Sequence, residues 1–543
     1  MLKKQKSKIL LLLIIILAVS LRLWRLAQIP EGFHADEAAF GYNAYSLLLT
    51  GKDEYGEFLP LVLRSFDDYK GAIYAYLAIP FVVVFGLNEL AVRLPTLVFG
   101  VGLTYLSFLI AVKLTGEKRL GLLTSFATAV SPWSILLSRV QSDPLVTVFF
   151  IVLGFYFFLI WLERNKRIYF FLQCICFMVS FFTYVSARVF FPIFVVLVIG
   201  FYFKQLTQGS RKLLIAGYFF IFVLDIFLTF GASGTRFGQI GIFRSPRVIM
   251  PMEEEMREDG QLETAKFFHN KLVAYGKYFA ENYLQYLSYD FLFLKGGQPA
   301  REAVPNSGLL YPIELLFLSA GLYFVFRKRM KWGYFMAGWL LLTPLVLSLA
   351  IDETPNVHRF FLVFLPVELL ITLGIIELMR CVTRKKILLP VVAIGVVTVY
   401  LASLASYLHQ LFIHQPKYRP WNRGFAYKEL SRQIQEYSSK YQKIVVTKAN
   451  AAPYIYLLFY QKYDPQKYQA FGGPRDFDEI GFDKFYFTAE NCPFYDGKSI
   501  LNRIYDKGQI LYVAKGDCPA PENTQILNLV KWGDDSPAFI LHE

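Results

Sequence analysis

Asp36 and Glu37 are adjacent carboxylates just after an apolar N-terminal segment, in a chain that is mostly apolar. Ionisable groups beside a membrane are costly unless they are paired or take part in chemistry. A carboxylate placed there can take a proton from a hydroxyl group as a general base. Asp36 is our candidate base, because it lies at the predicted outer end of the first apolar span. The alternative is that both side chains cap the following helix, and capping and catalysis are compatible.

Basic residues at the predicted outer ends of apolar spans form a second candidate set. Its members are Lys70, Arg93, Arg139 and Arg188, and the pair His358-Arg359 at the start of a later span would extend it. Arginine binds phosphate through two parallel hydrogen bonds and lysine binds it as a point charge. The alternative for each residue is that its long side chain only extends to the membrane–water interface and binds no phosphate. Several cations on one face nevertheless predict a phosphate site at headgroup depth.

Other polar residues near these positions are weaker candidates for binding a sugar or an acceptor. Asp67 and Asp68 lie beside Lys70 and could also hold a divalent ion, or simply form a solvated loop. Asp143 has the alternative of capping the span that starts at Pro144. The alternative for His269 is that it is an ordinary polar residue on the surface with no binding role. Oxygen-rich metal sites need several ligands in register, and the sequence does not show that register, so the metal question stays open.

The composition indicates a polytopic membrane protein, since 55% of the 543 residues are hydrophobic and only 18% are charged. Apolar stretches long enough to cross roughly 30 Å of hydrocarbon recur along the first three quarters of the chain. Eleven such spans are expected: Ile9 to Trp24, Ala91 to Val112, Leu120 to Leu137, Leu145 to Leu162, Ile168 to Tyr184, Val189 to Phe203, Leu213 to Phe230, Leu309 to Phe326, Gly333 to Ala350, Phe360 to Met379 and Ile387 to Phe412.

The net charge of +14 comes from short basic clusters beside these spans, which indicates topology rather than nucleic-acid binding. Under the positive-inside rule, eleven crossings place all of these clusters in the cytoplasm: Lys3 to Lys6, Lys113 to Arg119, Arg164 to Arg167, Lys204 to Lys212, Arg327 to Lys331 and Arg380 to Lys386. A further apolar stretch, 71–87, would invert the later loops if it crossed. We therefore expect it to form a juxtamembrane helix on the outer side. The first span lacks a small-residue cleavage site and is expected to stay as an anchor.

Two regions follow from this layout. Residues 1–412 are expected to form the membrane domain, with external loops at 30–70 and 231–308, the second carrying an interfacial helix. Residues 413–543 have a soluble composition, and their patterns predict a small extracytoplasmic α/β domain. Its expected role is packing or acceptor positioning rather than catalysis. Cys492 and Cys518 lie there, and a disulfide between them is one of two open outcomes.

An ordered series of short motifs runs through the first 200 residues. The series consists of His34 to Tyr42, Gly51-Lys52-Asp53, Asp67 to Lys70, Ala91 to Pro95, Ser131-Pro132-Trp133 and Ser138-Arg139. In this order the motifs resemble the protein O-mannosyltransferase and aminoarabinose transferase superfamily, GT-C fold glycosyltransferases that use polyprenyl-phosphate sugars. The resemblance is to the bacterial type of glycosyltransferase family 39.

The resemblance implies an all-α polytopic GT-C membrane protein with about eleven transmembrane helices and a C-terminal α/β domain. It implies an inverting glycosyltransferase that moves one sugar from a polyprenyl phosphate to a hydroxyl on a lipid, glycan or protein at the extracytoplasmic face. Asp36 corresponds to the family's leading acid, Glu37 would orient Asp36 or the acceptor, and Lys70 and Arg93 match positions that hold the lipid phosphate. No cofactor is implied with certainty, although a divalent metal is possible.

Departures from the family bear on the acceptor. The chain lacks the large external repeat domain of eukaryotic protein mannosyltransferases, and Trp421 is followed by Asn422 rather than by a tryptophan-aspartate signature. The alternative function is a transporter or flippase of lipid-linked sugars, but the internal symmetry typical of transporters is not seen. A noncatalytic scaffold would leave the Asp36-Glu37 and arginine series unexplained. A bacterial or archaeal plasma membrane is expected, with the N-terminus cytoplasmic.

Overall fold

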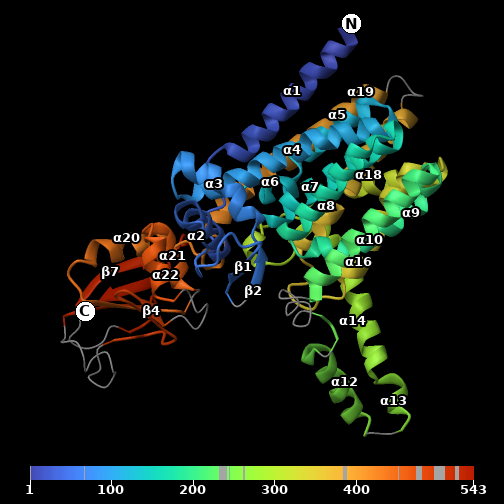
Figure 1. Cartoon of the computed structure of the whole chain (residues 1–543). Helices are drawn as coiled ribbons and strands as arrows, with labels where there is room; N and C mark the ends of the chain where they lie inside the picture. Colours follow the sequence, from blue (N-terminus) through green and yellow to red (C-terminus); the bar gives the residue numbers. More distant parts are fainter. Residues whose placement is uncertain are drawn as a thin grey trace. The chain divides into compact units, whose positions relative to one another are not determined.

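The computed structural model describes residues 2–66, 68–230, 241–243, 245–260, 263–382, 388–449, 452–472, 480–494, 508–519 and 525–543 (Figure 1). The chain divides into two compact units. The helical unit comprises Met1–Leu23, Val98–Ser138 and Ser142–Gln410. The mixed unit comprises Trp24–Leu97, Arg139–Gln141 and Leu411–Glu543. Residues 30–70, predicted to be the first external loop, thus belong to the same unit as the C-terminal segment, whereas the division at residue 412 remains a sequence-based prediction.

Each of the expected apolar spans contains a helix in the structure. These helices are α1 (Leu2–Leu23), α4 (Glu89–Thr115), α5 (Lys118–Val130), α6 (Pro132–Leu137), α7 (Asp143–Arg164), α8 (Arg167–Thr183), α9 (Ser186–Tyr202), α10 (Gln208–Phe230), α15 (Glu314–Arg327), α16 (Lys331–Leu347), α18 (Phe364–Val382) and α19 (Leu388–His409). By length and composition, five helical stretches among the described residues are able to cross a membrane: Glu89–Thr115, Asp143–Arg164, Ser186–Gln205, Val357–Val382 and Pro390–Lys417. The predominantly helical architecture is confirmed, and the number of crossings stays a prediction.

The third expected span is broken into α5 and α6 at Ser131-Pro132. Proline cannot donate a backbone hydrogen bond, so it begins a new helix at the first position of α6. The carbonyl groups at the end of α5 are satisfied by Arg22, whose guanidinium donates to Thr128 O at 3.1 Å and to Ala129 O at 2.9 Å. Arg22 is fully buried, and it stabilises the break from the neighbouring helix α1.

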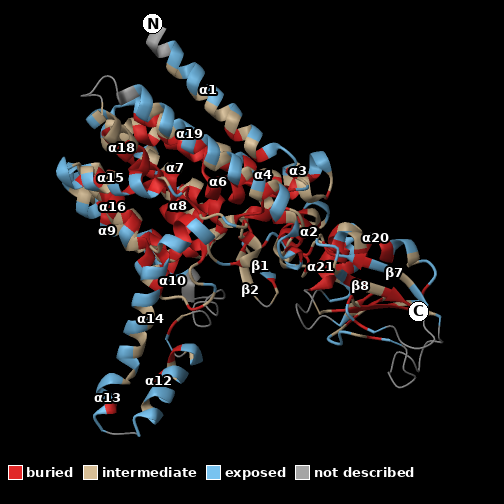
Figure 2. Ribbon diagram, turned by 180° about the vertical axis from the view of Figure 1, so that it is seen from behind, coloured by how far each residue is buried: buried red, intermediate tan, exposed pale blue. Residues whose placement is uncertain are grey.

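The core of the helical unit lies around α18, which is almost entirely buried, while α19 is mostly exposed (Figure 2). Helix α15 packs closely against α18 because glycines face each other there. A Cβ atom on Gly374 would lie 1.9 Å from Phe317 O, and one on Gly321 would lie 2.0 Å from Leu370 O. Only residues without a side chain permit the two backbones to approach this closely.

Helix α3 (Ile73–Phe85) occupies the apolar stretch that was expected not to cross the membrane. Its 13 residues measure about 20 Å at 1.5 Å per residue, which is short of the roughly 30 Å of hydrocarbon. Whether α3 crosses the membrane stays a prediction, since α15, with 14 residues, is hardly longer.

The large external loop contains helices in its described part. Helices α12 (Pro246–Glu258) and α14 (Lys271–Tyr286) run side by side, joined through the short α13 (Ala265–Phe268), as Figures 1 and 2 both show. Residues 231–240, 244 and 261–262 of this loop lie outside the described residues. Short helical turns follow the pair, η2 (Asp290–Lys295) and η3 (Ala300–Glu302), and α17 (Val357–Phe360) with η4 (Phe361–Val363) leads into α18.

The C-terminal segment forms a six-stranded mixed sheet with strand order β4-β5-β3-β6-β8-β7. Its strands are β3 (Lys443–Thr447), β4 (Gly481–Phe482), β5 (Phe485–Thr488), β6 (Ile510–Lys515), β7 (Ile526–Lys531) and β8 (Pro537–His542). Strand β3 pairs in parallel with β5 and β6. Helices α20 (Tyr427–Tyr437), α21 (Pro453–Tyr460) and α22 (Pro465–Ala470) accompany the sheet, and the turns η5 (Gln410–His414), η6 (Gln415–Lys417) and η7 (Pro420–Arg423) lead into it. The expected strand-rich C-terminal region is confirmed, although β4 and β8 were not predicted.

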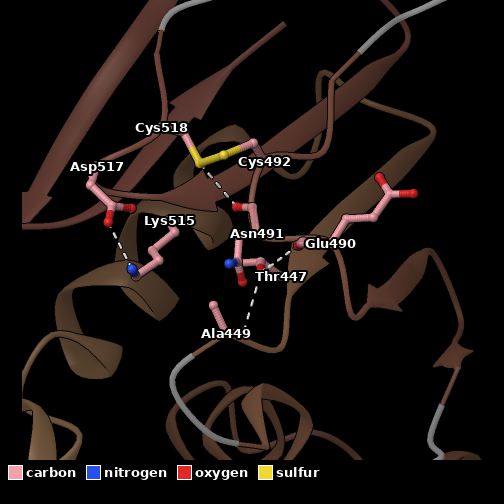
Figure 3. Close-up of a disulfide and its surroundings, with 8 residues drawn as sticks. All are labelled: Thr447, Ala449, Glu490, Asn491, Cys492, Lys515, Asp517 and Cys518. Atoms are coloured by element: carbon pink, nitrogen blue, oxygen red, sulfur yellow. Dashed lines mark hydrogen bonds and ion pairs between the residues drawn. A yellow bond between two sulfur atoms is a disulfide. The ribbon is translucent and has the colours of Figure 1, made fainter.

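A disulfide joins Cys492 to Cys518, so the first of the two open outcomes holds (Figure 3). It links the segment after β5 to the segment after β6. The backbone N–H of Lys515 also donates to Asn491 O at 2.8 Å, which ties the same two segments together. Cys174, Cys176 and Cys381 are free cysteines.

Candidate functional site

The carboxylate pair lies in the first turn of α2 (Ala35–Thr50), which begins immediately after His34. The Nδ1 atom of His34 accepts a hydrogen bond from the Asp36 backbone at 3.2 Å. In return, the His34 backbone donates to Glu37 Oε2 at 3.0 Å, completing a capping box. The capping interpretation is therefore correct for Glu37, and the helix start fixes where both carboxylates point.

Glu37 lies in a buried ionic network in the mixed unit. Its Oε1 atom accepts from Arg93 Nε at 3.0 Å and from the Gln141 backbone at 3.1 Å, and its Oε2 atom accepts from Arg423 Nη2 at 2.6 Å. Burial alone would disfavour the charged form, but Arg93 and Arg423 outweigh it and lower the pKa of Glu37 to about 2. Glu37 is thus a permanently ionised internal anion with a side chain that is only 3% exposed.

Asp36 has different surroundings, because its side chain is 25% exposed and forms an ion pair with Lys70. Lys70 lies in strand β2 (Asp68–Gly71), which pairs with β1 (Val62–Ser65) as a short antiparallel hairpin. The Lys70 ammonium also lies 5.0 Å from the centre of the Phe66 ring, within range of a cation–π interaction. The hairpin therefore holds a cation directly against the more accessible carboxylate.

Arg93 and Arg139 donate hydrogen bonds to backbone carbonyl groups within the mixed unit. Both are fully buried. Arg93 donates to the carbonyl oxygens of Leu26 at 3.0 Å, Pro30 at 3.1 Å and Gly32 at 2.6 Å. Arg139 donates to Trp24 O at 2.7 Å and Ile29 O at 3.0 Å. In this structure the two guanidinium groups hold the segment that leads into α2, and their expected role as lipid-phosphate ligands stays a prediction.

The remaining loop candidates are the neighbouring aspartates of the hairpin. Asp68 begins β2, is partly buried, and its Oδ1 atom accepts from the Tyr69 backbone at 2.8 Å. Asp67 lies outside the described residues.

Three candidates from the first half of the helical unit and its external loop have local partners. Arg188 in α9 donates to Phe181 O at 3.2 Å. Asp143 is the first residue of α7, but the side-chain cap of that helix is Ser142, which accepts from the Leu145 backbone at 3.3 Å. His269 lies 3.1 Å from Glu255 and 2.9 Å from Asp259, so it joins α12 to the segment before α14.

The pair before α18 also has partners inside the helical unit. The Arg359 guanidinium binds both carboxylate oxygens of Asp352, at 2.9 and 2.8 Å. His358 Nε2 lies 3.9 Å from a carboxylate oxygen of Glu302. The structure thus places Arg188, Asp143, His269, His358 and Arg359 in the helical unit, whereas Asp36, Glu37, Lys70, Arg93 and Arg139 belong together in the mixed unit.

Arg423 is the main residue that the sequence interpretation missed. It lies in η7, 386 positions after Glu37, and the local sequence carries no signal that pairs it with an N-terminal carboxylate. Across the described ranges, no three histidine, cysteine, aspartate or glutamate side chains are grouped so that they could hold a metal ion.

Comparisons with known proteins bear on the family and the fold. The family model of dolichyl-phosphate-mannose-protein mannosyltransferase matches residues 12–237. No curated protein matches the sequence. ArnT from Cupriavidus metallidurans bound to undecaprenyl phosphate is similar in structure, with 12% identity, coverage of 98% of this chain and 97% of that chain, and a TM-score of 0.54.

An oligosaccharyltransferase from Archaeoglobus fulgidus, tethered to an acceptor peptide, is also similar. It has 13% identity and a TM-score of 0.54, over 94% of this chain and 69% of that chain. At these identities the structural likeness establishes the fold. The match to residues 12–237 and the shared fold confirm the resemblance drawn from the motifs, and the chain has the fold of these GT-C glycosyltransferases.

Proposed function

We propose that this protein transfers a sugar from a polyprenyl-phosphate donor to a hydroxyl acceptor at the extracytoplasmic face, with Asp36 as general base. The observation that carries the proposal is the partly exposed Asp36 carboxylate, paired with Lys70 at the start of α2. The membrane face is inferred from the basic clusters between the predicted spans. The positive-inside rule places the loops with these clusters in the cytoplasm, so the loop that contains Asp36 is predicted to be extracytoplasmic.

The proposed reaction is a single displacement. The acceptor hydroxyl attacks the anomeric carbon, its proton passes to the Asp36 carboxylate, and the bond between that carbon and the phosphate oxygen breaks. The phosphate leaves with the bonding electrons, and the configuration at the anomeric carbon inverts. A phosphate monoester is a good leaving group because its second pKa is about 6. The protein therefore needs to supply one base and one cation.

Lys70 supplies the cation in this proposal. Its ammonium already neutralises Asp36, and as a compact charge with three donors it can bind an incoming phosphate as well. When the phosphate is bound, the Lys70 charge is shared between the two anions, and Asp36 stays ionised as a base. Arg93 and Arg139 stabilise the site indirectly, because they donate hydrogen bonds to the backbone of the segment before α2.

Glu37 takes no direct part in this proposal, because its oxygens already accept from Arg93, Arg423 and two backbone groups. Its role is to fix the first turn of α2 and so the direction of the Asp36 side chain. This agrees with the orienting role that the family resemblance implied.

The comparisons support the donor class without establishing it for this chain. The ArnT structure contains undecaprenyl phosphate, and the archaeal enzyme is tethered to an acceptor peptide. The family match of residues 12–237 spans Asp36, Lys70, Arg93 and Arg139. The sugar and the acceptor are left open by this proposal.

The test is transfer of radiolabelled sugar from a panel of polyprenyl-phosphate sugars by purified protein, with crude cell envelope as acceptor. We expect wild type to transfer label and Asp36→Asn to lose at least about a hundredfold in rate while still binding the donor lipid. Lys70→Ala should weaken donor binding as well as rate. Equal transfer by wild type and Asp36→Asn would remove Asp36 as the base. Absence of transfer from every donor, with translocation of lipid-linked sugar in liposomes, would favour the flippase alternative.

A further inference from the structure

We propose that Arg423, in the segment that follows the last long helix, is a positioning residue for the Asp36–Lys70 site. The C-terminal segment is then a structural part of the reaction centre and not only an acceptor-binding or packing domain. This inference rests on the proposed function for its effect on catalysis, but its structural part can be tested separately.

The contact between Arg423 and Glu37 is short and protected from water. Arg423 Nη2 donates to Glu37 Oε2 at 2.6 Å, and the side chains of both residues are 3% exposed. A charge-assisted hydrogen bond of this kind is stronger than a neutral one. Removing one member of a buried ion pair leaves the other charge buried and uncompensated, so the geometry is strongly enforced.

A close approach between two backbone segments places Arg423 beside Glu37. Gly32 lies against Arg423, and a Cβ atom on Gly32 would come within 2.8 Å of both Arg423 Cβ and Arg423 O. Gly32 also has a φ of +86°, a conformation that glycine adopts readily. Its carbonyl oxygen in turn accepts from Arg93 at 2.6 Å. Arg93 and Arg423 therefore contact the same carboxylate and the same glycine.

A second contact route leads from the C-terminal segment to the other half of the site. The ring of Tyr454 in α21 lies 6.1 Å from the ring of Phe66, measured between centroids. The Lys70 ammonium lies 5.0 Å from the centre of the Phe66 ring. Lys70 pairs with Asp36. The C-terminal segment thus contacts Glu37 directly through Arg423, and reaches Lys70 through Tyr454 and Phe66.

Further contacts make the attachment of α2 to the C-terminal helices rigid. Gln469 in α22 donates to Ser46 Oγ at 3.1 Å and to Thr50 Oγ1 at 3.2 Å. In the middle of α2, the Tyr42 hydroxyl donates to Tyr463 O at 3.1 Å. Because α2 is held along its length, a change at Arg423 is expected to act on the first turn and not to release the whole helix.

The charges around Asp36 give the inference an electrostatic consequence. Asp36 faces Lys70 and His34 directly, and Glu37 lies next to it with Arg93 and Arg423 behind. Loss of Arg423 leaves Glu37 paired with Arg93 alone, so the net charge around Asp36 becomes more negative by one unit. The Asp36 carboxylate should then hold its proton to a higher pH.

The experiment compares wild type, Arg423→Gln and Arg423→Lys, with Arg432→Gln as the matched control. Arg432 makes an ion pair too, but its side chain is 61% exposed on α20 of the same unit. We expect Arg423→Gln to lower kcat for sugar transfer at least tenfold with less than a threefold change in the donor KM. The acid limb of its pH profile should move to higher pH. Arg423→Lys should recover part of kcat, and Arg432→Gln should match wild type.

The positioning role would be overturned if Arg423→Gln kept the wild-type kcat. It would also be overturned if activity fell while the acid limb of the pH profile stayed in place and Arg423→Lys recovered no activity. Thermal unfolding of Glu37→Gln, Arg423→Gln and the double variant tests the pair without any activity. The double variant should lose less Tm than the sum of the single losses. Additive losses would overturn the inference. If wild type transferred no sugar but the Tm losses of the single variants did not add up in the double variant, only the proposed function would be contradicted.

Discussion

Asp36 and Glu37 are neighbours in sequence but have opposite surroundings, and helix geometry explains why. Successive residues of an α-helix point about 100° apart, since one turn takes 3.6 residues. In the first turn of α2 this rotation directs Glu37 into the buried network and leaves Asp36 partly exposed beside Lys70. One carboxylate can therefore anchor the structure while the other remains available for chemistry.

Replacing Glu37 with glutamine is expected to destabilise the protein by about 3 kcal/mol, because two buried arginines lose their counter-charge. Thermal unfolding of the purified protein measures this effect. Glu429→Gln is the control, since Glu429 also pairs with an arginine but has a side chain that is 46% exposed. Equal Tm values for Glu37→Gln and wild type would show that the network is not structural.

The low pKa of Glu37 predicts how stability depends on pH. The folded value is about 2 and the ordinary value is 4.5, so the unfolded chain binds the proton more readily. The resulting stabilisation is complete above pH 4.5 and is lost as the pH falls toward 2. We expect the Tm of wild type to fall more steeply than that of Glu37→Gln in this interval. Parallel curves for the two proteins would contradict the assignment.

At the residue scale, the sequence pointed to Asp36 and Lys70 separately, as a base and a phosphate-binding cation, but not to their ion pair or to the network behind it. Asp36 and Lys70 were singled out because short motifs carry them. The backbone partners of Arg93 and Arg139 were not predicted, because a sequence does not reveal which backbone carbonyl groups need a donor. Arg423 was missed because its partner lies far away in the chain.

At the scale of elements, the contact between α15 and α18 depends on two glycines. Gly374→Ala should destabilise the protein by about 1–3 kcal/mol, because its methyl group would overlap Phe317 O. Gly395→Ala in α19 is the matched control, since a Cβ atom added at Gly395 would meet no other atom within 4 Å. Thermal unfolding in detergent should show a loss of Tm only for the first variant. A loss of similar size in both would show that the overlap with Phe317 O is not its cause, since glycine to alanine by itself favours a helix.

The disulfide stabilises the sheet of the C-terminal segment. Cys492 and Cys518 are 26 residues apart, and closing a loop of that length is worth about 3 kcal/mol through the unfolded chain. The double variant Cys492→Ser and Cys518→Ser should therefore unfold at a lower temperature, and reductant should lower the Tm of wild type in the same way. Cys381→Ser, at a free and exposed cysteine, should leave Tm unchanged. Insensitivity of wild type to reductant would contradict the bond.

Helices were predicted better than strands, and the physical reason is the length of the signal. An apolar run of about eighteen or more residues has few alternatives to a helix in a membrane. The hairpin of β1 and β2 has strands of four residues each, with no clear alternation, and gave no comparable pattern. Strand β8 pairs between β6 and β7, so its position depends on contacts that are distant in sequence.

At the scale of the whole molecule, composition predicted a membrane protein but not the grouping of its parts. The first external loop belongs to the same compact unit as the C-terminal segment. Hydropathy describes which residues enter the membrane, whereas this grouping depends on side-chain contacts such as those of Arg423, Tyr454 and Gln469.

The predicted membrane topology can be tested by labelling. In a background without the three free cysteines, Asp534→Cys should react with a membrane-impermeant maleimide in intact cells, because the C-terminal segment is predicted to be extracytoplasmic. Lys118→Cys, in a basic cluster, should react only after the membrane is permeabilised. Labelling of both positions in intact cells would contradict eleven crossings.

The pairing of Arg423 with Glu37 also sets an order of events during synthesis. Asp36 and Glu37 are made early, but their partner arginine follows 386 residues later. At about 5–20 residues per second this interval lasts roughly 20–80 s. Arg93 follows Glu37 after 56 residues, and from then until η7 is made only one of the two arginine partners of Glu37 exists. A chain that stops before η7 therefore lacks the second arginine of the Glu37 network, so if the proposed function is correct, the end of translation sets when the activity begins.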